Sequence, residues 1–251
     1  MVIILSFFFL AKKGFDKNKL IILAIFSSFL AIIGARLFHY FLHKDSYAKN
    51  PDLLFNLDFQ GQAVIGGLIG AFLGVYIISK LLKIDYWKIL DSVAPFAGIG
   101  LIIGRIGCLL AGCCFGKETD LLIGITFPLF SPVHKYQLSQ NLGSIFYSHP
   151  VHPTQIYEMI AGLLIFLIGI FILKKTKKDG IAILVVILIY LVFRLIDNYF
   201  RAPALAYSVP DWFYPSFYLV LIGIIGFGLL KKLKSRKELK IENGELKIIK
   251  K

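Results

Sequence analysis

Long apolar runs separated by short polar segments dominate the chain. A helix that crosses a bilayer needs about 20 predominantly apolar residues, and runs that meet or approach this length recur from residue 20 onward. The last but one continues through a polar stripe to Pro203. The pattern predicts an all-α integral membrane protein, a polytopic bundle of transmembrane helices. The expected spans are Leu20–Leu42, Gly61–Leu82, Asp91–Leu110, Gln155–Leu173, Gly180–Phe193 and Tyr214–Leu230.

A shorter apolar piece, Met1–Leu10, precedes these spans and is followed at once by lysines. We expect it to be the end of a helix whose beginning is missing, through truncation or a misplaced start; the alternative is a re-entrant or interfacial piece. With it, the bundle has about seven transmembrane helices, the first one truncated. We expect a single membrane domain over residues 1–251, with the helical bundle in 1–230 and a basic cytoplasmic tail in 231–251.

The charge distribution predicts the topology. Only 17% of the residues are charged and the mean hydropathy is +0.76, whereas soluble domains carry about 25% charged residues. The net charge of +13 lies in short loops and in the tail, so we exclude nucleic acid as a partner and expect membrane lipids instead. Basic loops are cytoplasmic by the positive-inside rule. They are Lys12–Lys19, Lys80–Lys88, Lys174–Lys178 and the tail from Lys231.

This topology predicts a multi-pass protein of a bacterial plasma (inner) membrane with a cytoplasmic C-terminus. It also places the polar groups of several spans toward the outer face. Three arginines there, Arg105, Arg194 and Arg201, need an anion, because a lone charge inside a membrane is costly. The phosphate of a phospholipid fits the two-pronged guanidinium. The other outward groups are Arg36, His39, Gln60, Gly61, residues 106–116, His152–Glu158 and the loop Cys113–Tyr157.

The long loop Cys113–Tyr157 carries four prolines and the histidines His134, His149 and His152. Loops of this length are usually functional, although a surface excursion without chemistry is the alternative. Structural interpretations exist for other groups too. Arg36 with His39 fits an interfacial anchor, and the ladder Gly66-x-x-x-Gly70-x-x-x-Gly74 suits close helix packing. Arg194 and Asp197 are spaced for a pair within one helix.

The three cysteines, Cys108, Cys113 and Cys114, lie within seven positions. They do not form a disulfide framework. The first interpretation is small apolar residues that pack a helix end. The second is a redox or disulfide role, which an outer-face position permits. The third is metal binding together with a loop histidine, although the paired C-x-x-C spacing typical of such sites is missing; we expect no metal.

Several motifs, taken in order, resemble the prolipoprotein diacylglyceryl transferase family over roughly residues 13–230. The ordered set is specific, although no single motif decides it. The motifs are Gly34-Ala-Arg36-Leu, Gly66-Gly67-Leu-Ile-Gly70, Asp91-x-x-Ala-Pro95, Gly104-Arg105-Ile-Gly107, Gly116, His152-Pro-Thr-Gln-Ile-Tyr-Glu158 and Tyr190-x-x-Phe-Arg194-x6-Arg201-x-Pro203.

The resemblance implies a seven-helix membrane enzyme without a cofactor. Such enzymes move the diacylglyceryl group of phosphatidylglycerol to the thiol of a lipobox cysteine in a prolipoprotein signal peptide, and glycerol phosphate leaves. The implied residues fall into two sets. The catalytic ones are Arg105, Arg194, His152 and Glu158, and those that bind phosphatidylglycerol are Arg105, Arg36, Arg201, Tyr190, Gly66 and Gly67.

The sequence departs from the family pattern where protons would be handled. Ile65 stands where the family has a histidine, Asn198 where it has an acid after the later arginine, and Asp197 is adjacent. Two asparagines and a glutamate are replaced by Cys108, Ala111 and Cys113. His39, His152 or Glu158 are substitute bases, with His152 preferred. Alternatively, the arginines lower the pKa of the substrate thiol without a dedicated base.

Two other functions stay open at this point. The departures would fit a non-standard paralogue that binds phospholipid but has lost or altered the transfer step. The cysteines by themselves would fit a membrane thiol or redox protein unrelated to lipid transfer.

Overall fold

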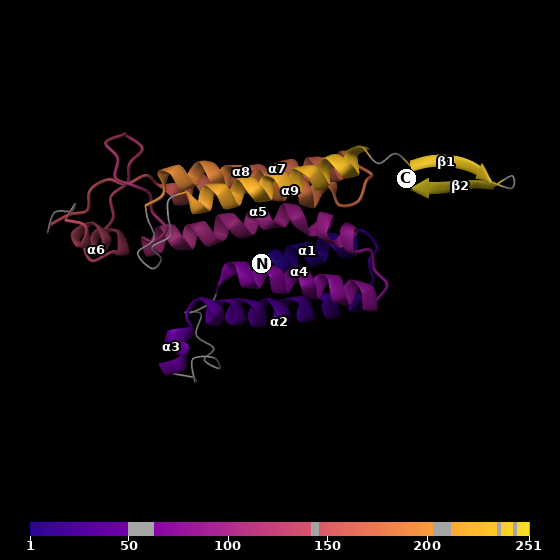
Figure 1. Cartoon of the computed structure of the whole chain (residues 1–251), viewed down its shortest axis with the longest axis horizontal. Helices are drawn as coiled ribbons and strands as arrows, with labels where there is room; N and C mark the ends of the chain where they lie inside the picture. Colours follow the sequence, from indigo (N-terminus) through magenta and orange to yellow (C-terminus); the bar gives the residue numbers. More distant parts are fainter. Residues whose placement is uncertain (50–62, 142–145, 203–211, 235–236, 243–244, 251) are drawn as a thin grey trace. The chain divides into compact units, whose positions relative to one another are not determined.

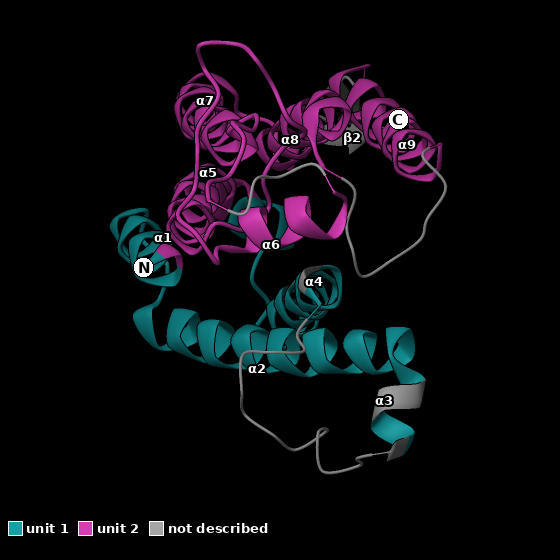
Figure 2. Ribbon diagram, turned by 90° about the vertical axis from the view of Figure 1, so that its left-hand side faces the viewer, with its two compact units in different colours: residues 1, 3–90 teal, residues 2, 91–251 magenta. Residues whose placement is uncertain are grey.

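The computed structural model of the chain describes residues 1–49, 63–141, 146–202, 212–234, 237–242 and 245–250. These residues form apolar helices, as predicted, with two short helices between them (Figure 1). The chain divides into two compact units, residues 1 and 3–90 and residues 2 and 91–251 (Figure 2). The single membrane domain expected over residues 1–251 stays a prediction.

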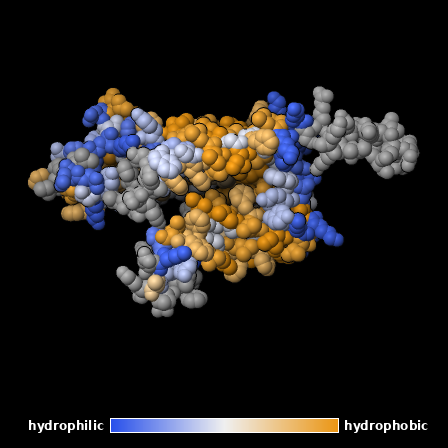
Figure 3. Space-filling view, viewed as in Figure 1, coloured by the Kyte–Doolittle hydropathy of each residue, from blue (hydrophilic) through white to orange (hydrophobic). Residues whose placement is uncertain are grey.

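Seven apolar helices are present in the described residues, which confirms the expected number. Five are long and apolar enough to cross a membrane: α2 (Lys17–Leu42), α5 (Tyr86–Ala111), α7 (Thr154–Lys175), α8 (Ile181–Phe200) and α9 (Phe213–Lys234). The other two, α1 (Val2–Lys12) and α4 (Val64–Leu81), are shorter. Figure 3 shows hydrophobic residues over the long helices and hydrophilic residues where these helices end. The protein is therefore a polytopic helical membrane protein.

Local sequence signals explain where several helices begin. The Asp16 carboxylate accepts a hydrogen bond from Asn18 N (2.8 Å) at the start of α2. Asp85 likewise accepts from Lys88 N (3.1 Å), and α5 therefore begins at Tyr86, five residues before the predicted start. These carboxylates satisfy amide groups that the first turn of a helix leaves unpaired. The predicted span Gly61–Leu82 is observed as α4, and its first two residues lie outside the described part of the chain.

Unit 1 is organised around the packing of α4 on α2. The backbones of Gly34 and Gly66 lie in direct contact, and a Cβ added to Gly66 would collide with Gly34 O and with Phe38 Cβ. Gly70 meets Leu30 O in the same way, and a Cβ on Gly74 would lie 2.7 Å from Ser27 Cα. The glycine ladder therefore lets the two helices approach closely, as its spacing predicts. The short helix α3 (Lys44–Lys49) follows α2.

Replacing Gly66 with alanine is expected to lower the free energy of unfolding by roughly 1–3 kcal/mol, because overpacked contacts must move apart. Gly67→Ala is the matched control, since a Cβ there would lie at an ordinary 3.5 Å from Ala31 O and Ala35 Cβ. Denaturant unfolding of the detergent-solubilised chain measures both variants. Equal stability of the two would show that the α2–α4 contact is looser than described.

Unit 2 contains the larger bundle. Helix α8 packs against α7 and α9, and the Asp91 carboxylate of α5 accepts hydrogen bonds from Gly180 N (2.5 Å) and Ile183 N (2.9 Å) at the start of α8. A carboxylate is favourable at the positive end of a helix dipole. The contact therefore fixes the start of α8 to α5 and sets how far along α5 the polar end of α8 lies.

The loop between α5 and α7 carries the short helix α6 (Pro132–Ser139), which begins with Ser131 accepting from His134 N (3.2 Å). After α9, the strands β1 (Lys237–Glu242) and β2 (Glu245–Lys250) pair in an antiparallel hairpin. This hairpin was not predicted, although the Asn-Gly pair between the two strands is the dipeptide most typical of such turns. The all-α class holds for the membrane part of the chain.

Candidate active site

The side chain of Glu158, in the second turn of α7, is the centre of a polar cluster in unit 2. We call it the arginine cluster; its members are Arg105, Glu158, Arg194, Asp197 and Arg201. Its Oε2 accepts from Arg105 Nε (2.8 Å) and pairs with Arg105 Nη2 (2.5 Å), and Arg105 comes from the last turns of α5. Its Oε1 accepts from Arg194 Nη1 (2.7 Å) and from Arg201 Nη1 (2.9 Å) at the end of α8. Side chains from α5 and from the end of α8 thus converge on one carboxylate of α7.

A second acid completes this arginine cluster. Asp197 Oδ2 accepts from Arg194 Nη1 (2.9 Å) and, more weakly, from Arg201 Nη1 (3.4 Å). The predicted pair of Arg194 with Asp197 is therefore present. Both carboxylates are almost fully buried, and the three arginine side chains are 14–19% exposed. Three guanidinium groups and two carboxylates leave a net charge of +1 in a largely enclosed place.

A short segment after α5 ties the parts of the site together. Gly116 N donates to His152 O (2.9 Å), and Lys117 N donates to Phe200 O (2.8 Å). Gly116 also forms a β-bridge with Arg201. A Cβ at Gly116 would lie 2.5 Å from His152 Cβ and 2.8 Å from Phe200 O. Only glycine therefore fits between the start of α7 and the end of α8.

The three cysteines lie next to this cluster. Cys108 Sγ is 3.9 Å from Arg105 Nη1, and the turn after α5 brings Cys113 and Cys114 back toward Cys108, so that the three sulfurs lie within 4.8 Å of one another. The carbonyls of this turn are held from α7, because Gln155 Nε2 donates to Cys113 O (2.7 Å) and Thr154 Oγ1 donates to Cys114 O (2.6 Å). All three thiols are free.

The thiols of Cys113 and Cys114 differ in acidity. Burial raises the pKa of Cys113 to about 12, and its two cysteine neighbours add to the effect. Burial also acts to raise the pKa of Cys114, but the positive charges of Arg201 and Arg105 outweigh burial and bring this pKa below the ordinary thiol value.

We expect alkylation of the reduced protein to follow this difference in acidity, because the thiolate is the reactive form. The rate at which iodoacetamide modifies Cys114 should level off at a lower pH than that of an unperturbed thiol, whereas the rate at Cys113 should be slower and should still be rising as the pH approaches 12. Peptide mass spectrometry measures both sites. Arg201→Gln should move the Cys114 profile to higher pH, whereas Lys135→Gln, at an exposed position of α6, should not. Identical pH profiles of alkylation for Cys113 and Cys114 would contradict this difference in acidity.

The other predicted residues of unit 2 surround the cluster without all joining it. His152 Nδ1 lies 3.1 Å from Tyr157 Oη, and its ring packs on Phe200 at 5.1 Å. It therefore borders the arginine cluster through the backbone rather than through its ring. Tyr190 lies close enough to Arg194, Glu158 and Arg105 to interact electrostatically. Arg194 Nε also donates to Tyr218 Oη of α9 (3.3 Å), a partner that was not predicted.

The remaining predicted residues lie in unit 1. Arg36 and His39 are on α2, and His39 Nδ1 is 2.8 Å from Tyr47 Oη. Gly66 and Gly67 are on α4, where Gly66 is taken up by the contact with Gly34. Gln60, Gly61 and Pro203 lie outside the described residues. The structure therefore brings together the predicted arginines of unit 2 with Glu158, and it leaves the unit 1 residues as separate predictions.

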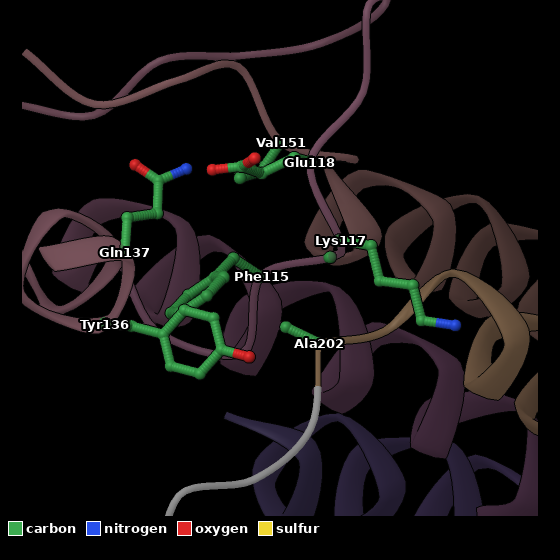
Figure 4. A pocket seen from close by; sticks show the side chains of 8 residues that line it. Phe115, Lys117, Glu118, Tyr136, Gln137, Val151 and Ala202 are labelled. Atoms are coloured by element: carbon green, nitrogen blue, oxygen red, sulfur yellow. The ribbon is translucent and has the colours of Figure 1, made fainter. Parts of the chain in front are cut away.

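A pocket of about 120 Å³ lies in the loop region beside the Gly116 segment (Figure 4). The rings of Phe115 and Tyr136, 5.3 Å apart, form one wall, and Gln137 and Glu118 lie across from them. The sequence did not single out these four side chains, because they are brought together from α6 and from the loop segment 115–118. Its lining residues are Phe115, Gly116, Lys117, Glu118, Tyr136, Gln137, Val151 and Ala202.

Comparisons with known proteins agree with the resemblance seen in the sequence. A family model described as prolipoprotein diacylglyceryl transferase matches residues 1–230. A phosphatidylglycerol–prolipoprotein diacylglyceryl transferase of Clostridium tetani is 31% identical over 192 residues, which are 76% of this chain and 71% of the relative. A second, numbered 2, from Clostridium perfringens is 30% identical over 90% of this chain and 84% of the relative. The chain therefore belongs to the prolipoprotein diacylglyceryl transferase family.

Proposed function

We propose that this protein transfers the diacylglyceryl group of phosphatidylglycerol to the thiol of a lipobox cysteine in a prolipoprotein. Family membership and the names of the relatives support this activity. The observation that carries it is the arginine cluster around Glu158. It holds three guanidinium groups against two carboxylates inside a membrane protein. An enclosed net charge of +1 suits a phosphate anion.

The reaction needs a stabilised leaving group. The carbon–oxygen bond between the diacylglyceryl group and the phosphate breaks, the oxygen keeps the electron pair, and a sulfur–carbon bond forms. Glycerol phosphate departs as an anion. Arg105 can receive it, because within the described residues its Nη1 has only the weak acceptor Cys108 Sγ, at 3.9 Å. A phosphate oxygen would replace that sulfur as a stronger, charge-assisted acceptor.

Arg194, Arg201 and Tyr190 would complete the phosphate site. Arg194 and Arg201 share Glu158 and Asp197, so these acids orient both guanidinium groups while leaving the cluster positive. Electrostatic stabilisation of developing charge is commonly the largest catalytic contribution. We keep Arg36, Gly66 and Gly67 as predicted phosphatidylglycerol-binding residues of unit 1.

The proton of the substrate thiol must leave before or during attack, because the thiolate is the nucleophile. Glu158 is a poor candidate for its acceptor, since both of its oxygens accept from arginines. The net positive charge of the cluster favours the thiolate by itself. His152, which pairs with Tyr157 Oη at 3.1 Å, is our candidate acceptor, and it would replace the histidine that Ile65 removes.

We infer that the site faces the outside of a bacterial plasma membrane and that the C-terminus is cytoplasmic. Along α7, Glu158 and Lys174 are separated by about 24 Å, at 1.5 Å per residue. This distance approaches the thickness of the hydrocarbon core. The lysines at the end of α7 and α9 would then mark the cytoplasmic side by the positive-inside rule.

The test is a transfer assay with the full chain in detergent. Phosphatidylglycerol labelled in the glycerol phosphate is incubated with a lipobox peptide, and we expect release of labelled glycerol phosphate together with thioether formation on the peptide. The same peptide with serine in place of the lipobox cysteine should accept nothing. Binding of phosphatidylglycerol without transfer would overturn the proposal in favour of an altered paralogue. The absence of both binding and transfer would favour a thiol protein.

A further inference from the structure

The three cysteine sulfurs of the chain form one compact group that the transfer reaction does not use. All three cysteines of the sequence take part, and their Sγ atoms lie within 4.8 Å of one another. The thiols are free and half-buried. The C-x-x-C spacing is absent, so spacing alone did not predict this convergence.

The backbone holds the sulfurs in place before any ligand arrives. Helix α5 ends at Ala111, and Gly112 turns the chain with φ +65°. Cys113 N then donates to Cys108 O (3.0 Å), which closes the helix end. Cys114 has φ +59°, a left-handed conformation that costs a non-glycine residue about 1–2 kcal/mol. Such strain persists where the surroundings fix it.

The surroundings that fix the turn come from α7. Gln155 and Thr154 are fully buried, and they hold the carbonyls of Cys113 and Cys114 at 2.7 and 2.6 Å. Because both carbonyls are bound, the side chains of Cys113 and Cys114 are directed back toward Cys108. A disulfide would use two of the sulfurs and leave the third, whereas a metal ion uses all three.

The distances and charges suit a thiophilic ion. Metal–thiolate bonds are about 2.3 Å long, so three sulfurs around one ion lie about 4 Å apart. The three sulfurs here lie within 4.8 Å of one another, so only a small contraction is needed. Arg105, with Nη1 at 3.9 Å from Cys108 Sγ, offsets part of the negative charge of three thiolates. In the part of the chain described here, the group contains no fourth histidine, cysteine or acid.

We propose that Cys108, Cys113 and Cys114 bind one thiophilic d10 metal ion, Cu(I) or Zn²⁺. Thiolates select both ions; Cu(I) is satisfied by three sulfurs, and Zn²⁺ would add a water as its fourth ligand. The bound ion would lock the end of α5 to the turn that α7 holds. It would also take Cys108 Sγ away from Arg105 Nη1 and leave that donor to other acceptors. The proposal does not depend on the transfer activity.

The test is metal binding by the reduced full chain, purified without a histidine tag. In separate arms, the chain competes with a chromophoric chelator for Cu(I) and for Zn²⁺. We expect one equivalent of one of the two ions to bind and to raise the thermal unfolding midpoint, and three thiols to become protected from alkylation. Cys108→Ser, Cys113→Ser and Cys114→Ser should each weaken binding at least 10-fold. His149→Ala, on a partly exposed loop histidine, is the matched control and should bind as the parent chain does.

Other outcomes would overturn the site. Undiminished uptake by a triple variant with serine at all three positions would place the ion elsewhere. An unaltered affinity in any one single variant would remove that sulfur from the site. No uptake of either ion by reduced chain with three reactive thiols would also contradict it. If the chain instead purifies with a disulfide between two of the cysteines that resists mild reduction, the group serves as a cross-link rather than as a metal site.

Discussion

Replacing Glu158 with glutamine is expected to lower the free energy of unfolding by about 3–5 kcal/mol, the usual cost of removing one partner from a buried ion pair. Glutamine keeps the shape of the side chain but removes its charge. Arg105, Arg194 and Arg201 would then face one another with only Asp197 to balance them, and the net charge of the cluster would rise from +1 to +2. Denaturant unfolding in a mild detergent measures the change.

Glu118→Gln is the matched control, because Glu118 is one-third exposed and lies 3.9 Å from His149. Pairs of that kind contribute about 0–1 kcal/mol. A second variant separates charge from packing. Adding Arg105→Gln to Glu158→Gln removes one of the three stranded cations and should recover part of the lost stability, which a double-mutant cycle resolves. Equal losses in Glu158→Gln and Glu118→Gln would show that Glu158 does not centre the cluster.

Arg105→Ala is expected to reduce the transfer of diacylglyceryl groups roughly 100-fold or more, the scale on which single donors to a developing anion act. The variant keeps Arg194 and Arg201 on Glu158, so the folded unit should survive. Its cluster would hold two arginines and two acids, and the net charge would fall from +1 to zero. A neutral cluster has no surplus charge for a phosphate. The transfer assay with labelled phosphatidylglycerol gives the rate.

Arg105→Lys tests the geometry apart from the charge. It restores the net charge but lacks the fork that binds Glu158 through Nε and Nη2 and leaves Nη1 for a ligand, so we expect only partial recovery of the rate. Lys135→Ala removes an exposed cation of α6 in the same unit and should leave the rate unchanged. Full activity of Arg105→Ala, with the variant folded, would remove Arg105 from the reaction.

The sequence by itself determined the class of protein and the extent of most helices. Backbone groups must be satisfied within a helix once an apolar run enters a bilayer, so the lengths of these runs predicted α2, α7 and α9 to within a few residues. The end of α8 is matched only when the polar continuation of its apolar run to Pro203 is counted. It also predicted the intrahelical pair of Arg194 and Asp197, because residues three apart lie on one helix face. The early start of α5 at Tyr86 was missed, since a single capping residue, Asp85, decided it. The hairpin of β1 and β2 was not predicted, because the lysine-rich tail was interpreted only as a topology signal.

Only the tertiary structure decided what the charged groups face. The sequence showed that three arginines need an anion, but it could not show that Glu158 binds all three, because residues 105, 158, 194 and 201 come from three helices and meet through packing. The same holds for the cysteines: a left-handed turn and two carbonyl contacts from α7 bring together sulfurs that carry no spacing signal. Periodicity determines which residues share one helix face, whereas contacts between helices depend on how those faces dock.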